Sequence, residues 1–142
     1  MSNLEDTHNP HLTILLAEDD PDDQELIKEA FSEADISFEL KIVKDGKSAI
    51  NYLEATPDKK LPCLIVLDYN MPELNGAEVL QHLYDKPRYK KIPKVILSTS
   101  GNKFYIQEAL KKGAYAYRIK PSNYTRLVEI AKEMIDLCNS AA

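Results

Sequence analysis

Four places in this sequence carry side chains that could do chemistry together. They are the acidic run Glu18-Asp19-Asp20, an isolated Asp68, the hydroxyl of Ser98 and the pair Lys120-Pro121. Carboxylates that lie close together repel one another and require a cation, and hard divalent ions such as Mg²⁺ take oxygen ligands of this kind. Asp19 and Asp68 are the expected direct ligands of such an ion.

A divalent ion beside a lysine also suits a phosphoryl group, because the ion and the ammonium together neutralise its oxygens. In that arrangement Asp68 would attack as a carboxylate nucleophile and form an aspartyl phosphate. Each residue alone has an ordinary explanation, since acids after strands often solvate loops, cap helices or occupy turns. The hypothesis therefore depends on all four places lying together.

The elements that must position these residues follow an alternating pattern. Short apolar runs at residues 12–17, 38–43, 63–67, 94–97 and 114–119 alternate with segments of helical period, which predicts βαβ units. The predicted fold class is therefore α/β, a doubly wound five-stranded parallel sheet with five helices. Ligands bind outside the carboxyl ends of the strands of such a sheet, so the four places should converge on one edge.

Four strings carry a family resemblance: LLAEDDP, LIVLDYNMPELNG, VILSTS and AYAYRIKP. They resemble the signature blocks of response-regulator receiver domains of two-component signalling, over residues 12–138. The spacings of 30 residues from Asp68 to Ser98 and 22 from Ser98 to Lys120 are similar to those of the family. The resemblance implies the flavodoxin-like receiver fold with strand order 2-1-3-4-5.

The resemblance also implies a function and a role for each site position. Asp68 would accept phosphate from a histidine kinase with Mg²⁺, in a phosphoprotein that assists its own phosphorylation and dephosphorylation but is not otherwise an enzyme. The metal ligands would be Glu18, Asp19, Asp68 and the backbone carbonyl of Asn70. Ser98 would be the switch hydroxyl, and Lys120 the cation that holds the phosphoryl oxygens.

Two further positions concern the switch and its output. The bond from Lys120 to Pro121 is expected to be cis, which would aim the ammonium across the sheet. Tyr117 matches the aromatic that moves when Ser98 engages phosphate. The expected output is the face of the fourth helix, fifth strand and fifth helix, which would bind a partner or form a homodimer. The aromatic residues near it are Phe104, Tyr105, Tyr115, Tyr117 and Tyr124. They could equally well only pack the helix onto the sheet.

The sequence departs from the commonest receiver pattern in three places. Ser98 stands where threonine is more usual, and without the methyl its rotamer is less constrained. Thr99 stands where a small residue is frequent and would narrow the phosphate entrance. The long stretch from Ala55 to Pro62, with PDD after the acidic pair, resembles single-domain regulators partnered with phytochrome-type histidine kinases.

Composition limits what else the chain could be. Its 142 residues suit one receiver domain at 12–139 behind a flexible N-terminal tail, residues 1–11, with no output domain left over. No apolar run approaches the roughly 20 residues of a membrane helix, and no leader is recognisable, so a cytoplasmic location is expected. The net charge of −5 argues against nucleic acid as a partner. Cys63 and Cys138 fit no metal pattern and are expected to be reduced core thiols.

Three alternatives come from other classes. A flavodoxin-like electron carrier would share the element order, but its FMN phosphate would be repelled by the acidic first loop. A small Mg²⁺ phosphatase with an aspartyl nucleophile would place a second acid where this chain has Asn70. A phosphorylation-independent binding module would not need a complete site.

Overall fold

The computed structural model describes residues 12–35 and 37–140 of the 142-residue chain. The predicted tail at residues 1–11 lies outside them. The strands are β1 (Thr13–Ala17), β2 (Glu39–Val43), β3 (Leu64–Leu67), β4 (Lys94–Ser98) and β5 (Ala116–Ile119). The α-helices are α2 (Pro21–Ala34), α3 (Gly46–Ala55), α4 (Gly76–Tyr84), α5 (Lys103–Lys111) and α6 (Tyr124–Ser140), with short 3-10 helices at Asp58–Lys60 and Pro87–Tyr89. No helix within the described ranges combines the length and apolar character needed to cross a membrane.

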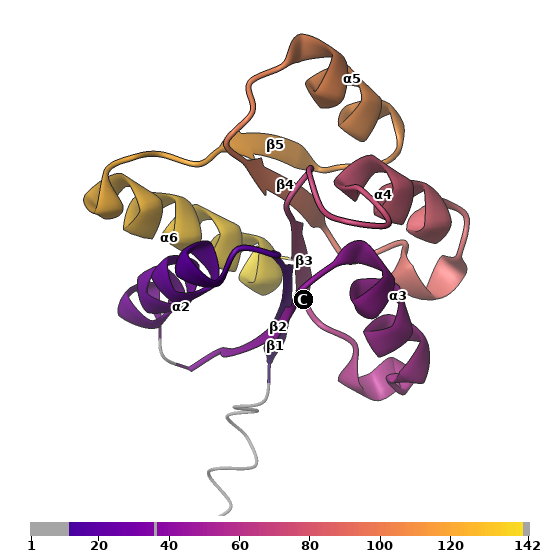
Figure 1. The fold of residues 1–142 in the computed structure, drawn as a ribbon. Helices are drawn as coiled ribbons and strands as arrows, with labels where there is room; N and C mark the ends of the chain where they lie inside the picture. The colour runs from indigo at the N-terminus through magenta and orange to yellow at the C-terminus, as the bar shows by residue number, and fades with distance from the viewer. Residues whose placement is uncertain (1–11, 36, 141–142) are drawn as a thin grey trace, which may run out of the picture.

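The five strands form one parallel sheet in the order β2-β1-β3-β4-β5. Helices α2 and α6 cover one face, and α3, α4 and α5 cover the other (Figure 1). Because both faces are covered, all four residues of β3 are buried, which explains the unbroken apolar run in the sequence. The predicted fold class, with its strand order and five helices, is confirmed.

Successive residues of a strand point to opposite faces, so β1 contributes to two separate cores. Ile14 and Leu16 pack with α2 and α6, whereas Leu15 and Ala17 pack with the three helices of the other face. Helices therefore pack on both faces of the sheet whose carboxyl ends carry these loops.

The loop after β3 is fixed by local chemistry around Gly76. A β-carbon at Gly76 would lie 2.7 Å from the backbone oxygen of Asp68, so only glycine allows this close approach. The adjacent Asn75 caps α4, because its side chain accepts from the amide of Glu78 and its own amide donates to the Glu78 carboxylate, both at 2.8 Å. The start of α4 is thereby tied to the backbone of Asp68.

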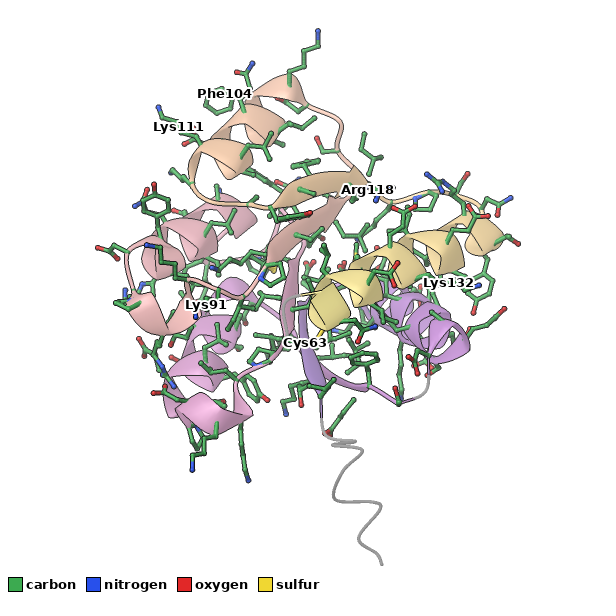
Figure 2. All side chains as sticks on the ribbon, turned by 180° about the vertical axis from the view of Figure 1, so that it is seen from behind. Cys63, Lys91, Phe104, Lys111, Arg118 and Lys132 are labelled. Carbon is green, nitrogen blue, oxygen red and sulfur yellow. A yellow bond between two sulfur atoms is a disulfide. The ribbon has the colours of Figure 1, made fainter. Side chains whose placement is uncertain are left out.

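The two cysteines do not behave as the sequence suggested. Cys63 and Cys138 form a disulfide that joins the residue before β3 to the last turn of α6 (Figure 2). The prediction of two reduced thiols is wrong, because packing of α6 on the sheet brings their α-carbons within 5.1 Å, a normal disulfide separation. Sequence spacing could not reveal this contact, since 75 residues separate the pair.

Candidate functional site

The carboxyl ends of four strands meet at one edge of the sheet, and each is followed or closed by a polar side chain. Glu18 follows β1, Asp68 follows β3, Ser98 ends β4, and Lys120 follows β5. Backbone hydrogen bonds continue the ladder into these positions: the Asp68 amide donates to Ala17 at 3.0 Å, and the Lys120 amide donates to Ser98 at 2.8 Å. The convergence predicted from sequence is present.

An acidic cluster forms the centre of this edge. Glu18, Asp19 and Asp68 each offer a carboxylate oxygen, and these oxygens lie within 4.8 Å of one another. Glu18 is 1% exposed and Asp68 8%, whereas Asp19 is open to solvent. Three oxygens at this spacing, with one side open to water, fit a hard divalent cation that keeps part of its hydration shell.

Lys120 supplies the positive charge beside the cluster. Its ammonium lies 2.6 Å from Glu18 Oε1 and 3.5 Å from Asp68 Oδ2. Burial acts to lower the pKa of Lys120, but hydrogen bonds to the carboxylates outweigh this effect and raise the pKa. Lys120 therefore carries its charge throughout the ordinary pH range.

The carboxyl of Glu18 is strongly affected by its position. Burial raises its pKa to about 7, with the neighbouring Asp68 acting in the same direction and the Lys120 hydrogen bond opposing both. Its carboxylate also accepts from the amide of Asp20 at 3.1 Å. The Glu18 carboxyl therefore loses its proton near neutral pH, and a bound cation would compensate the charge that results.

Sequence reasoning missed two residues of α2 that support the site. Asp23 in the first turn accepts a hydrogen bond from Lys120 at 2.9 Å, and the amide group of Gln24 donates to the backbone oxygen of Glu18 at 2.6 Å. Pro21 at the first helical position places this turn directly over the acidic run. Acids are common in first turns for dipole reasons alone, so the sequence did not single out Asp23.

Asn70 lies in the loop between β3 and α4, two residues after Asp68, and is exposed. The loop is closed beside it by the Gly76 amide, which donates to Tyr69 at 2.7 Å. A second acid, as an aspartyl phosphatase would require, is absent at this position. The role of the Asn70 carbonyl as a metal ligand stays a prediction.

Ser98 and Tyr117 occupy neighbouring strands at the site. Ser98 is 1% exposed, and its hydroxyl oxygen accepts from the Ser100 amide at 3.3 Å. Tyr117 is half-buried, with its hydroxyl donating to the Ser100 oxygen at 2.7 Å. Both predicted switch residues thus contact the same short segment after β4.

Tyr117 belongs to a row of three aromatic rings. Tyr69, next to Asp68, stacks on Tyr105 of α5 with ring centres 4.2 Å apart and lies 6.4 Å from the ring of Tyr117. The row leads from the residue after Asp68 to α5 and β5. A displacement of the Asp68 loop would therefore move the contacts of Tyr69 with α5 and β5.

The peptide bond from Lys120 to Pro121 is trans, since the described part of the chain has no cis peptide bond. The expectation of a cis bond is wrong. The trans form is the slightly favoured one for a bond before proline, and here Lys120 reaches its carboxylates in that form.

Comparison with known proteins agrees with this geometry. Residues 14–132 match the family model of the response regulator receiver domain. The response regulator Rcp1 of Synechocystis sp. is 33% identical over 91% of this chain and 90% of its own length. Among solved structures, the phosphorylated cyanobacterial phytochrome response regulator RcpA is 35% identical, with a TM-score of 0.82 over 93% of this chain and 96% of that one. A Mn²⁺-bound form of Rcp1 gives a TM-score of 0.75 at 32% identity, over 86% of this chain and 90% of that one.

The strand order, the site at the carboxyl edge and the matches over nearly the whole chain agree with one another. An FMN carrier does not suit an edge whose first loop presents Glu18 and Asp19. The chain belongs to the response regulator receiver domain family of two-component signalling.

Proposed function

We propose that this chain is a single-domain response regulator that accepts a phosphoryl group from a histidine kinase onto Asp68. The observation that carries the proposal is the position of Asp68, inside the cluster with Glu18 and Asp19 and 3.5 Å from the ammonium of Lys120. The phosphoacceptor role, the metal ligands and the domain boundaries 12–139 are part of this proposal.

In the proposed transfer, the chain supplies the nucleophile and holds the charged groups around it. A carboxylate oxygen of Asp68 forms a bond to phosphorus while the bond from phosphorus to the kinase histidine breaks, and the histidine ring, protonated on its other nitrogen, leaves as neutral imidazole. Lys120 neutralises one phosphoryl oxygen as charge accumulates. In hydrolysis, water would attack phosphorus while the bond from phosphorus to the Asp68 oxygen breaks, which releases inorganic phosphate and restores the carboxylate. The chain would thus assist both its phosphorylation and its dephosphorylation.

A divalent ion, Mg²⁺ in the cell, would be held by Glu18, Asp19, Asp68 and the carbonyl of Asn70. When bound, it would neutralise phosphoryl oxygens that the acidic cluster alone would repel. The Mn²⁺ in the similar Rcp1 supports a divalent ion here. The carboxylate spacing of 4.8 Å or less is the supporting observation in this chain.

The switch would run from Asp68 through Ser98 and Tyr117 to the face formed by α5, β5 and α6. Phosphate on Asp68 would draw the Ser98 hydroxyl toward it and change the contact between Tyr117 and Ser100. This face exposes large apolar side chains, Phe104 of α5 at 64% and Ile119 of β5 at 50%. We propose that it forms a homodimer or docks a partner in the phosphorylated state.

A phytochrome-type histidine kinase is the proposed phosphodonor, because the similar RcpA is a phytochrome response regulator. Nucleic acid and membranes are not part of the proposed function.

We propose a cytoplasmic location for the chain. Disulfides such as Cys63–Cys138 are uncommon in the cytoplasm, because thiol reductants keep cysteines reduced there. Cell fractionation combined with trapping of thiols tests the location and the disulfide together.

The test of the phosphoacceptor is intact-mass analysis after incubation with acetyl phosphate and Mg²⁺. Wild-type protein should gain one phosphoryl group, and excess EDTA should prevent it. Asp68→Asn should fold but gain none, whereas the control Asp136→Asn, an exposed position on α6, should behave as wild type. A phosphorylated Asp68→Asn protein, or labelling that survives EDTA, would overturn the proposal.

A further inference from the structure

The opposite end of the sheet holds a feature that the proposed phosphorylation cycle does not use. Two adjoining cavities of about 300 and 280 Å³ lie where β4 begins, and both are lined by Lys90, Lys94 and Gly113. We call them together the distal cavity. Its remaining walls come from Leu80, Tyr84, Lys91, Ile92, Pro93, Lys112, Tyr115 and Leu137.

The charge of the distal cavity has one sign. Among residues 12–35 and 37–140, four lysines line it and no aspartate or glutamate does. Lys112 forms an ion pair with Glu108 at 3.1 Å, but none of the ion pairs among the described residues involves the other three lysines. In a chain whose net charge is −5, this is a local concentration of positive charge in which only Lys112, among the described residues, has a carboxylate ion-pair partner.

Lys94 makes the cavity more than a group of surface lysines. It is only 8% exposed, and its ammonium donates to one neutral acceptor, the backbone oxygen of Tyr89, at 2.5 Å. Burial lowers the pKa of this amine, and no carboxylate opposes the effect. An ammonium has three donors, and a buried cation without an anionic partner is energetically unfavourable.

A structural role explains part of this arrangement. The bond to Tyr89 caps the short 3-10 helix Pro87–Tyr89, and Lys112 near the end of α5 complements the helix dipole. The Tyr89 oxygen already accepts from the Ile92 amide at 3.2 Å, so the cap is not required to satisfy it. The cap also leaves unexplained why Lys90 and Lys91 line the same hollow without carboxylate partners.

We propose that the distal cavity binds a small phosphate-bearing molecule, with Lys94 as its central contact. Lysines are compact point donors that suit the tetrahedral oxygens of phosphate, whereas carboxylates are better matched by the planar fork of arginine, which the cavity lacks. A phosphate would supply acceptors for the remaining donors of Lys94 and for Lys90. The volumes lie near the lower end of the range of small-molecule sites.

Tyr84 and Tyr115 line the two parts of the cavity, and these residues are 59% and 64% exposed. A β-carbon at Gly113, which has a φ of 103°, would lie 3.1 Å from the Tyr84 ring, so a glycine here allows that ring to approach the backbone closely. Exposed rings beside a phosphate site offer a surface on which a flat base can stack. A nucleoside phosphate therefore matches more of the cavity than an inorganic ion does.

The test is a titration of the full chain with inorganic pyrophosphate and, in parallel, ADP, followed by amide NMR shifts. Excess EDTA prevents recruitment of the probes by metal at Asp68. Saturable shifts should centre on Lys94 and Gly113. Lys94→Met keeps the length of the apolar stem and should weaken binding at least about tenfold. Tighter binding of ADP than of pyrophosphate supports stacking in addition to the phosphate contact.

The matched control is Lys132→Gln, which removes the same charge from an exposed position on α6, on the other side of the sheet from α5 (Figure 2). It should bind as wild type. If Lys94→Met does not fold, Lys90→Gln should weaken binding severalfold. Equal affinity in wild type and the cavity variants, shifts centred on Lys120, or no saturation up to about 10 mM would overturn the proposal.

Discussion

Two lysines at opposite ends of the same sheet, Lys94 buried and Lys120 with a largely buried side chain, have opposite surroundings. Lys120 at the carboxyl edge contacts three carboxylates, those of Glu18, Asp23 and Asp68. Lys94 at the other end contacts a single backbone carbonyl. The pKa of Lys120 is raised and that of Lys94 is lowered, although both side chains are nearly buried.

The difference shows that burial alone does not determine what a buried charge does. At the carboxyl edge, anions and a cation offset one another, and an incoming divalent ion and phosphoryl group would enter an arrangement that already holds both signs. In the distal cavity the protein supplies only one sign of charge. The first arrangement is suited to chemistry, and the second to binding an anion.

The largest expected effect follows from removing the cation at the carboxyl edge. Lys120→Met should slow phosphoryl uptake from acetyl phosphate by about 100-fold or more, because one fixed donor to the transferring oxygens is lost. The rate of phosphoprotein formation, followed by intact mass, measures this. Lys132→Gln should be unaffected, and an unchanged rate in Lys120→Met would remove Lys120 from the site.

The next effect concerns the crosslink at the distal end of the sheet. Reduction of Cys63–Cys138 should lower the free energy of unfolding by about 2–4 kcal/mol, because the bond closes a long loop in the unfolded chain. Urea unfolding with and without a thiol reductant measures it, with the double variant Cys63→Ser, Cys138→Ser as control. That control should not respond to the reductant. Free thiols found by alkylation of the unreduced protein would contradict the disulfide.

The parts of the fold and of the site differ in how far the sequence could predict them. The strands and the meeting of Asp68, Ser98 and Lys120 followed from apolar runs and from a general property of parallel sheets. They depend on the order of elements, which the sequence displays directly. The strand at Lys94–Ser98 was also predicted, because its apolar residues follow without interruption.

Other features depended on packing between segments far apart in sequence. The disulfide requires the last turn of α6 to lie beside the start of β3, and the contact of Asp23 with Lys120 requires a particular helix entry angle. The burial of Lys94 was hidden because a lysine at the first position of a strand usually reaches solvent. The trans bond before Pro121 was mispredicted because resemblance alone suggested its geometry.

A third prediction uses the carboxyl of Glu18, whose pKa is about 7 in the folded chain, against an ordinary value of 4.5 for a solvated glutamate in an unfolded one. Between these values the folded chain binds more protons than the unfolded chain, so stability from this group falls as pH rises. The change amounts to about 3 kcal/mol over the window. In metal-free urea unfolding, Glu18→Gln should lack this dependence, and its stability relative to wild type should rise from pH 5 to 8. A constant difference would contradict the raised pKa.

The smallest expected effect is a gain in stability when the charge of Lys94 is removed, whereas removal of Lys120 is expected to impair phosphoryl uptake. Lys94→Met removes a charge that burial disfavours, keeps the apolar stem and leaves the Tyr89 oxygen bonded to Ile92, so it should stabilise the chain by about 1 kcal/mol at neutral pH. Burial lowers the pKa of Lys94 in the folded chain below its ordinary value of 10.5. As pH rises from the lowered pKa toward 10.5, the folded wild type loses the free-energy penalty of the buried charge. The stability advantage of the variant should therefore shrink between these two pH values. Thermal unfolding of both proteins at neutral pH and near pH 10 measures this, and saturating pyrophosphate should remove the advantage because it stabilises wild type more than the variant. A variant less stable than wild type at neutral pH without pyrophosphate would show that the cap on Tyr89 matters more than the buried charge.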